Sequence, residues 1–212
     1  SIVRVGPQHR GKADRGSDVL AASGVRVGGT DFDAALNLAA VMPLLGLGTR
    51  LVEKNLPMPN ALYHELATWA TINFAYTYKN ERELGELVSL AADPRKVGRL
   101  LTLVRRRLGH RVAFAVEDAK IALSAETQTS VPLDFLEAGL AARASRATFD
   151  RAVAGRIDRL SEAARDCIRA AGLKSDAIDT VFLTGGSSRV PAVRAGRARL
   201  SGHMRSGASR AR

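Results

Sequence analysis

The stretch from Ile178 to Val193 reads IDTVFLTGGSSRVPAV and constrains the fold more than any other part of the chain. Its first half is a short apolar run typical of a buried strand, Gly185-Gly186 favours a turn, and Pro191 is typical of a helix start. Adjacent glycines let a backbone approach a ligand closely, and the free N–H groups of a helix start favour an anion such as a nucleotide phosphate. The stretch is a candidate nucleotide-binding corner, although many such turns bind nothing.

Length and composition set the outer limits. A chain of 212 residues with 46% apolar residues can bury one core or two lobes. No apolar run approaches the roughly 20 residues needed to cross a bilayer, and no leader is seen, so we expect a soluble protein. The single cysteine, Cys167, can form no internal disulfide, which fits a cytoplasmic location. The sequence starts at Ser1 and not at a methionine, which favours a processed or partial product.

The net charge of +11 raises the question of nucleic acid. The last 19 residues, 194–212, contain six arginines and no acid, so most of the excess lies in this segment. It is rich in glycine, serine and alanine, and we expect it to be a disordered tail. Such a tail either binds RNA or acidic surfaces in a salt-sensitive way or has no evolved partner.

The apolar pattern predicts a mixture of helices and strands. Short strands are expected at 2–5 and within 126–136, and a hairpin at 19–27 turning at Ser23-Gly24. A first helix is expected from an N-cap at Thr30 or Asp31 to about Pro43, and a second over 81–90 after a break at Lys79-Asn80. A third is expected from Asp93-Pro94 to Leu123. A fourth is expected over 144–171, with Gly172 as its C-terminal stop. His64 is expected to pack or face solvent, since no metal-ligand spacing surrounds it.

The long predicted helix from Asp93 to Leu123 has an apolar stripe on one side and a basic side opposite. Its basic residues are Arg99, Arg105, Arg106, Arg107 and Arg111. A solvated helix face is the ordinary explanation. Nucleic-acid binding is the alternative, although no aromatic residues are interleaved with the arginines.

Three polar residues share one face near the end of that helix. Glu117, Lys120 and Ser124 stand at i, i+3 and i+7. A carboxylate, an ammonium and a hydroxyl on one stripe can hold a ribose and the edge of a base. Equally, Glu117 and Lys120 can be an ordinary surface pair. No hydrolase triad or metal cluster is visible, and the Asp14-Arg15-Gly16-Ser17 segment is interpreted as a surface turn because no apolar strand precedes it.

Three separated segments together resemble the DnaK-type heat-shock chaperones. They are Gly28–Asp33 (GGTDFD), Glu117–Ser124 (EDAKIALS) and Phe182–Pro191 (FLTGGSSRVP), and they occur in the order and at roughly the distances seen in that family. The helix beginning at Ser145 also resembles the one before the family's last glycine turn. The segment from Gly6 to Gly46 resembles the shorter, divergent bacterial branch. The resemblance extends over about residues 3–195.

The resemblance implies an α/β chain with the actin-like ATPase fold, of which this chain would be the C-terminal lobe. Residues 1–193 would form a partial nucleotide-binding domain, with a helical subdomain over about 34–136 and the tail at 194–212. Gly28 and Gly29 match a turn near the lobe interface.

The resemblance also implies an ATP or ADP site, with magnesium as the counter-ion of the nucleotide and not a ligand of this lobe. Glu117, Lys120 and Ser124 match residues that contact adenosine, and Ile121 matches a position that packs near the adenine. The turn that closes the other side matches Gly185, Gly186, Ser187 and Arg189.

Several family elements have no counterpart here. The first lobe, both phosphate loops, the catalytic lysine and the peptide-binding domain are lacking, and the segment after Arg194 looks unlike the family. Because phosphoryl transfer needs a positioned metal, lysine and water, we expect no ATP hydrolysis by this chain alone. Its expected partners are a first ATPase lobe or a full-length parent, unfolded clients and co-chaperones. The alternatives are a basic protein that binds nucleic acid and an inactive, decayed fragment.

Overall fold

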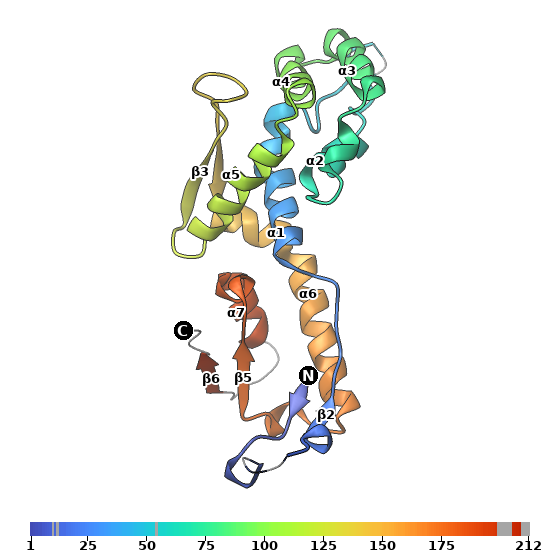
Figure 1. Ribbon diagram of the computed structural model, residues 1–212. Coiled ribbons are helices and arrows are strands. Elements are labelled where there is room, and N and C mark those ends of the chain that lie inside the picture. The colour runs from blue at the N-terminus through green and yellow to red at the C-terminus, as the bar shows by residue number, and fades with distance from the viewer. Residues whose placement is uncertain (10, 12, 54, 199–204, 209–212) are drawn as a thin grey trace. The chain divides into compact units, whose positions relative to one another are not determined.

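The computed structural model describes residues 1–9, 11, 13–53, 55–198 and 205–208 (Figure 1). The chain divides into two compact units. Unit 1 contains residues 1–27 and 154–212, and unit 2 contains residues 28–153. The predicted helical subdomain, about 34–136, therefore falls entirely within unit 2.

Unit 2 begins with helix α1 (Gly29–Leu36), which continues through the π-helical η3 (Asn37–Val41) and the 3-10 helix η4 (Met42–Leu45). The predicted N-cap at Thr30 or Asp31 is wrong. Gly28 is the N-cap, and its N–H donates to Asp31 Oδ2 over 2.7 Å. Asp31 thus lies in the first turn and accepts a hydrogen bond from the N-cap residue. Gly46 ends the run in the left-handed region, with φ +101°.

The next three elements are α2 (Ala61–Ala67), the 3-10 helix η5 (Ile72–Ala75) and α3 (Tyr78–Leu90). The predicted break at Lys79-Asn80 is wrong. Thr77 caps α3, and its Oγ1 accepts a hydrogen bond from Asn80 N over 3.1 Å. Both residues of the expected break therefore lie in the first turn of the helix.

The predicted long helix from Asp93 to Leu123 is two helices, α4 (Pro94–Arg105) and α5 (Gly109–Ala122). Between them Arg107 adopts a positive φ of 54°, which no continuous right-handed helix contains. The apolar stripe predicted for the single helix is nevertheless buried on both pieces, including Leu100, Val104, Val112 and Val116. Periodicity alone did not show the turn because the stripe resumes in phase after it.

Unit 2 is completed by an antiparallel hairpin of β3 (Gln128–Pro132) and β4 (Ala141–Ser145), with Val131 opposite Ala142. Helix α6 (Arg146–Ala170) follows, and its residues up to Val153 belong to unit 2 whereas the rest belong to unit 1. Within unit 2, α1 packs against α5, and α5 contacts β3 (Figure 1). The rings of Phe32 and Phe149 meet edge to face, with their centroids 6.4 Å apart.

Unit 1 contains β1 (Ile2–Val3) paired antiparallel with β2 (Val19–Ala21). The predicted hairpin at 19–27 is therefore wrong, because the partner of β2 is the N-terminal strand. The 3-10 helices η1 (Pro7–His9) and η2 (Gly16–Asp18) lie between these strands, and residues 14–17 are exposed, as predicted for a surface turn.

The C-terminal part of unit 1 confirms the predicted order of strand, glycine turn and helix, but the strand is not buried as predicted, and Phe182 is 62% exposed. Helix α6 stops at Gly172, which has φ +68°. The 3-10 helix η6 (Ser175–Ala177), β5 (Thr180–Leu183), the 3-10 helix η7 (Gly186–Arg189) and α7 (Pro191–Ala198) follow. Strand β6 (Arg205–Ala208) pairs parallel with β5.

The segment predicted as a tail, 194–212, contains the end of α7 and all of β6. Residues 199–204 and 209–212 lie outside the described residues, so their disorder stays a prediction.

Candidate nucleotide site

Lys120 occupies the centre of the predicted stripe on α5. It is one of the few buried charged residues that the structure describes, at 9% exposed. Its Nζ lies 2.7 Å from Asp33 Oδ1 on α1 and 4.0 Å from Glu117 Oε1 on its own helix. The main partner of Lys120 is therefore Asp33, which lies on the neighbouring helix. The sequence suggested a surface pair with Glu117 instead, and that contact is the longer of the two.

Burial is the largest influence on the Asp33 carboxyl group. Desolvation raises its pKa, the Lys120 ammonium lowers it by hydrogen bonding and charge, and the negative charge of Glu117 raises it again, with a net rise. The pair is thus buried enough for desolvation to oppose the charge attraction. Sequence analysis missed this role of Asp33, although Asp33 belongs to the GGTDFD segment that carries the resemblance.

The remaining predicted residues of α5 differ in exposure. Glu117 and Ile121 are exposed, whereas Ser124 is half-buried. The hydroxyl group of Ser124, in the turn after α5, donates to the carbonyl oxygen of Lys120 over 3.4 Å. Unit 2 therefore presents a carboxylate, a buried ammonium and an exposed apolar side chain on α5, with a hydroxyl in the turn that follows the helix.

The predicted glycine turn lies in unit 1. Gly185 has φ +83°, a conformation that favours glycine, and Gly186 opens η7. A Cβ atom added at either glycine would meet no heavy atom within 4 Å. The turn is held by Ser188, whose Oγ donates to Gly185 O over 2.7 Å. The backbone at Gly185 and Gly186 therefore has free space beside it that a ligand could occupy. Ser187 and Arg189 lie on the same short helix, η7.

The eight predicted nucleotide-contacting residues divide between the two units. Glu117, Lys120, Ile121 and Ser124 belong to unit 2, and Gly185, Gly186, Ser187 and Arg189 belong to unit 1. Each half is built as a local structure within its own unit. Their combination into one site stays a prediction.

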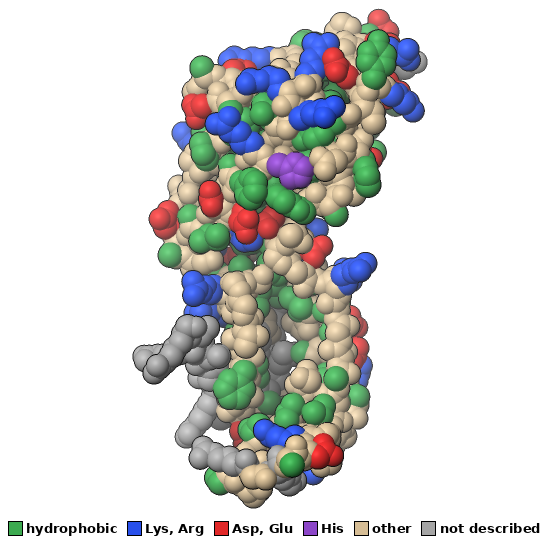
Figure 2. All heavy atoms as spheres, in the orientation of Figure 1, with side chains coloured by type: hydrophobic (Ala, Val, Ile, Leu, Met, Phe, Trp, Pro, Cys, Tyr) green, Lys and Arg blue, Asp and Glu red, His purple; other side chains and the backbone are tan. Residues whose placement is uncertain are grey.

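Most arginines of the predicted basic face have partners within the chain. Arg99 makes two hydrogen bonds to Glu137, at 2.7 and 2.9 Å, and Arg105 makes one to Glu81 at 2.7 Å. Arg106 donates to Phe135 O, and the guanidinium of Arg111 lies 4.3 Å from the centre of the Phe135 ring. Figure 2 shows basic, acidic and hydrophobic side chains interspersed on the visible face of unit 2. These contacts favour a structural role for the arginines.

In the part of the chain that the structure describes, no group of three His, Cys, Asp or Glu residues is placed to hold a metal ion. Within the same residues, none of the helices has the length and apolar character required to cross a membrane.

Residues 102–205 match the family model of the Hsp70 protein. The match covers just under half of the chain, includes all eight predicted nucleotide-contacting residues and supports membership of the Hsp70 family. It implies an actin-like ATPase fold, and the helices and small sheets described above are consistent with part of such an α/β fold. The family match also suggests a function of the chaperone type.

Proposed function

We propose that this chain is the C-terminal ATPase lobe of a DnaK-type chaperone, and that it binds ATP or ADP as part of a machine for protein folding. The observation that carries the proposal is the buried Lys120 on α5, in a segment that both resembles the adenosine-contacting helix and lies within the Hsp70 match. The ion pair with Asp33 compensates the desolvation of the Lys120 ammonium and holds it beside Glu117, so a donor and an acceptor stand at fixed positions for a ligand.

The residues of α5 suit a ribose and an adenine. The Glu117 carboxylate is exposed and can accept hydrogen bonds from ribose hydroxyl groups, and Lys120 Nζ retains donor capacity beyond its contact with Asp33. Ile121, which is 60% exposed, offers an apolar surface for the flat base. When bound, the nucleotide would supply the phosphates and the magnesium ion.

The glycine turn suits the second half of the same site. The open space beside Gly185 and Gly186 supports close approach of a nucleotide to the backbone. Arg189 is exposed and can lie against the other face of the base. The proposal therefore assigns the adenosine contacts to unit 2 and the glycine-turn contacts to unit 1.

We further propose that the chain does not hydrolyse ATP by itself. The sequence offers no counterpart for the family's catalytic lysine or phosphate loops, which position the metal and the attacking water. Hydrolysis would need a first lobe, supplied by a longer parent or by a separate chain. Unfolded clients and co-chaperones in the cytoplasm would then be its partners.

Calorimetric titration with ADP and with ATP plus magnesium tests the proposal. Lys120→Ala and Gly186→Val should each weaken nucleotide binding by roughly tenfold or more. A Cβ atom at Gly186 meets nothing in the folded chain, so Gly186→Val should block the ligand and preserve the melting temperature.

Two matched controls separate binding from folding. Gly24→Val changes another loop glycine of unit 1 whose Cβ would meet nothing within 4 Å, and Lys96→Ala breaks an exposed ion pair with Asp93 in unit 2. Both variants should bind nucleotide as the unaltered chain does. A chain that melts cooperatively and binds neither nucleotide would overturn the proposal.

A further inference from the structure

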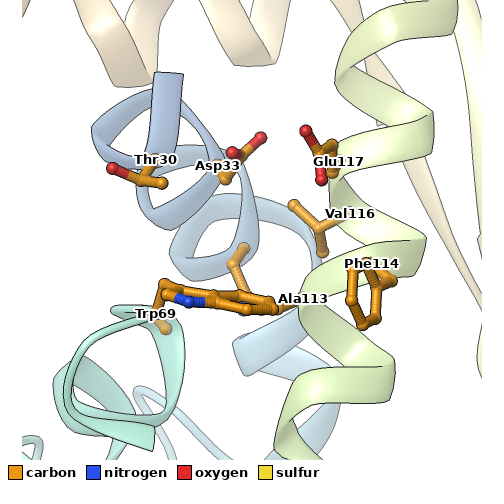
Figure 3. A pocket seen from close by; sticks show the side chains of 9 residues that line it. Thr30, Asp33, Trp69, Ala113, Phe114, Val116 and Glu117 are labelled. Atoms are coloured by element: carbon orange, nitrogen blue, oxygen red, sulfur yellow. The ribbon is translucent and has the colours of Figure 1, made fainter. Parts of the chain in front are cut away.

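A surface cavity of about 250 Å³ lies in unit 2 beside the proposed nucleotide residues. Its walls come from α1, the first residue of η3, the end of α2 with Trp69 just after it, and α5. Figure 3 shows Asp33 and Glu117 on the two facing helices, with the indole of Trp69 and the ring of Phe114 beside them. Since an engineered cavity of about 150 Å³ can bind benzene, this space can hold a group larger than one aromatic ring.

The electrostatics of the cavity favour a cation. Its lining includes two acids, Asp33 and Glu117, and no basic residue. Lys120 contacts both carboxylates but supplies a single positive charge. One negative charge is thus left for a ligand to balance, next to an apolar wall that weakens competition from water.

The aromatic wall suits a planar cation. Trp69 lies 5.3 Å from Phe114 and 4.9 Å from His110, measured between ring centroids, and both contacts are edge to face. Trp69 and Phe114 remain 44% and 56% exposed, so both side chains are accessible to a ligand. A guanidinium group can stack on such rings and still donate hydrogen bonds in its plane.

An unsatisfied acceptor gives an independent indication of a ligand. Asn37 lines the cavity and is 1% exposed, yet its Oδ1 has no hydrogen-bond partner among the residues that the structure describes. Buried side-chain oxygens are normally paired, because an unmade hydrogen bond costs free energy. A rotation of the Asn37 side chain toward the cavity would let a donor bound there satisfy this oxygen.

We propose that this cavity binds a guanidinium group, presented either by a free arginine-like molecule or by an arginine side chain of a partner protein. Asp33 and Glu117 balance its charge, Asn37 Oδ1 accepts one of its N–H groups, and Trp69 and Phe114 contact its flat face. The site goes beyond the proposed nucleotide function, with which it shares Glu117.

The chain carries its own reporter for this site, since Trp69 is its single tryptophan. Titration of the full 212-residue chain with argininamide should change Trp69 fluorescence in a saturable way, with matching heat by calorimetry. Citrullinamide has nearly the same shape without the charge and should bind roughly tenfold more weakly or not at all. Equal affinity for the two compounds, or no saturable signal by either method, would overturn the proposal.

Two single substitutions locate the binding. Phe114→Ala removes one aromatic wall and should weaken argininamide binding by roughly threefold or more. Phe74→Ala removes a phenylalanine that is 68% exposed and does not line the cavity, so it should leave the affinity unchanged. Equal effects of the two variants would contradict the assignment to this cavity.

The source of the guanidinium group is distinguished by a second ligand. An acetylated Gly-Arg-Gly amide should bind more tightly than argininamide if a protein partner presents the group, and more weakly if the ligand is a free molecule. Phe114 is outside the proposed adenosine-contacting set, so Phe114→Ala should bind ADP normally. Loss of argininamide binding with ADP binding intact therefore separates this site from the nucleotide site.

Discussion

The first residue of α5 is a glycine because two other side chains occupy the space of its missing Cβ. That atom would lie 2.6 Å from Tyr76 Oη and 2.7 Å from Ile72 Cγ2, and the N–H of Gly109 donates to Tyr76 Oη over 2.8 Å. We expect Gly109→Ala to lower the free energy of unfolding by about 1–3 kcal/mol through overpacking. Urea unfolding followed by circular dichroism measures this change.

The matched control for Gly109→Ala is Gly98→Ala in the neighbouring helix α4. A Cβ atom at Gly98 would meet nothing within 4 Å, so alanine should stabilise the chain by about 0.5–1 kcal/mol through helix propensity. Opposite signs for the two variants are expected. If Gly109→Ala were also stabilising, the close packing of Gly109 against Tyr76 would be wrong.

The residues of the candidate site could be chosen from the sequence, but their contacts could not. Spacing placed Glu117, Lys120 and Ser124 on one helix face, and in the structure Glu117 and Lys120 lie on α5 whereas Ser124 lies in the turn that follows it. Spacing could not show that Lys120 pairs with Asp33, because that contact depends on the packing of α1 against α5. Long-range packing likewise creates the cavity beside Trp69, for which no local pattern gave a signal.

At the scale of elements, ion pairs with a single carboxylate, that of Glu137, connect α4 to the loop between β3 and β4. Glu137 accepts two hydrogen bonds from Arg99 and is also paired with Arg95. Hydrogen bonds from Arg99 and then from Arg95 lower the pKa of Glu137 from 4.5 to about 2. The stabilisation is therefore complete above the unfolded-state pKa and is lost as the pH falls through the folded-state value.

Glu137→Gln should consequently lower the melting temperature at pH 7, and its deficit relative to the unaltered chain should shrink as the pH falls from 4.5 to about 2. Calorimetric melting curves at a series of pH values measure the deficit. Glu86→Gln is the control, because Glu86 lies 3.8 Å from Arg82 in an exposed pair and should contribute little. A Glu137→Gln deficit that does not vary with pH would contradict the ion-pair explanation.

Helices and strands were predicted unevenly, for reasons that differ between elements. The end of α6 at Gly172 and the order of β5, the glycine turn and α7 follow from local residue preferences, and the sequence predicted them. The break between α4 and α5 and the pairing of β1 with β2 were missed. In both cases the outcome depends on tertiary contacts, which override a local periodicity or turn signal.

At the scale of the whole molecule, the two units differ in how much apolar surface they bury. Unit 2 contains nearly all of the buried apolar side chains that the structure describes. Among the described residues, unit 1 buries only Ile157, Cys167, Ile168 and Val190. It also leaves large apolar side chains exposed, including Val5 and Phe182 at 65% and 62%. Unit 1 therefore has little hydrophobic stabilisation of its own.

We accordingly expect unit 1 to open more readily than unit 2. Regions with few buried apolar contacts open at low free energy, and their amide hydrogens exchange faster. Hydrogen exchange followed by mass spectrometry should show amides of 156–168 in α6 exchanging roughly tenfold or more faster than those of 110–122 in α5. Both segments are helical, so the comparison is free of differences in secondary structure. Equal protection of the two segments would mean that unit 1 gains stability from contacts beyond its four buried apolar side chains.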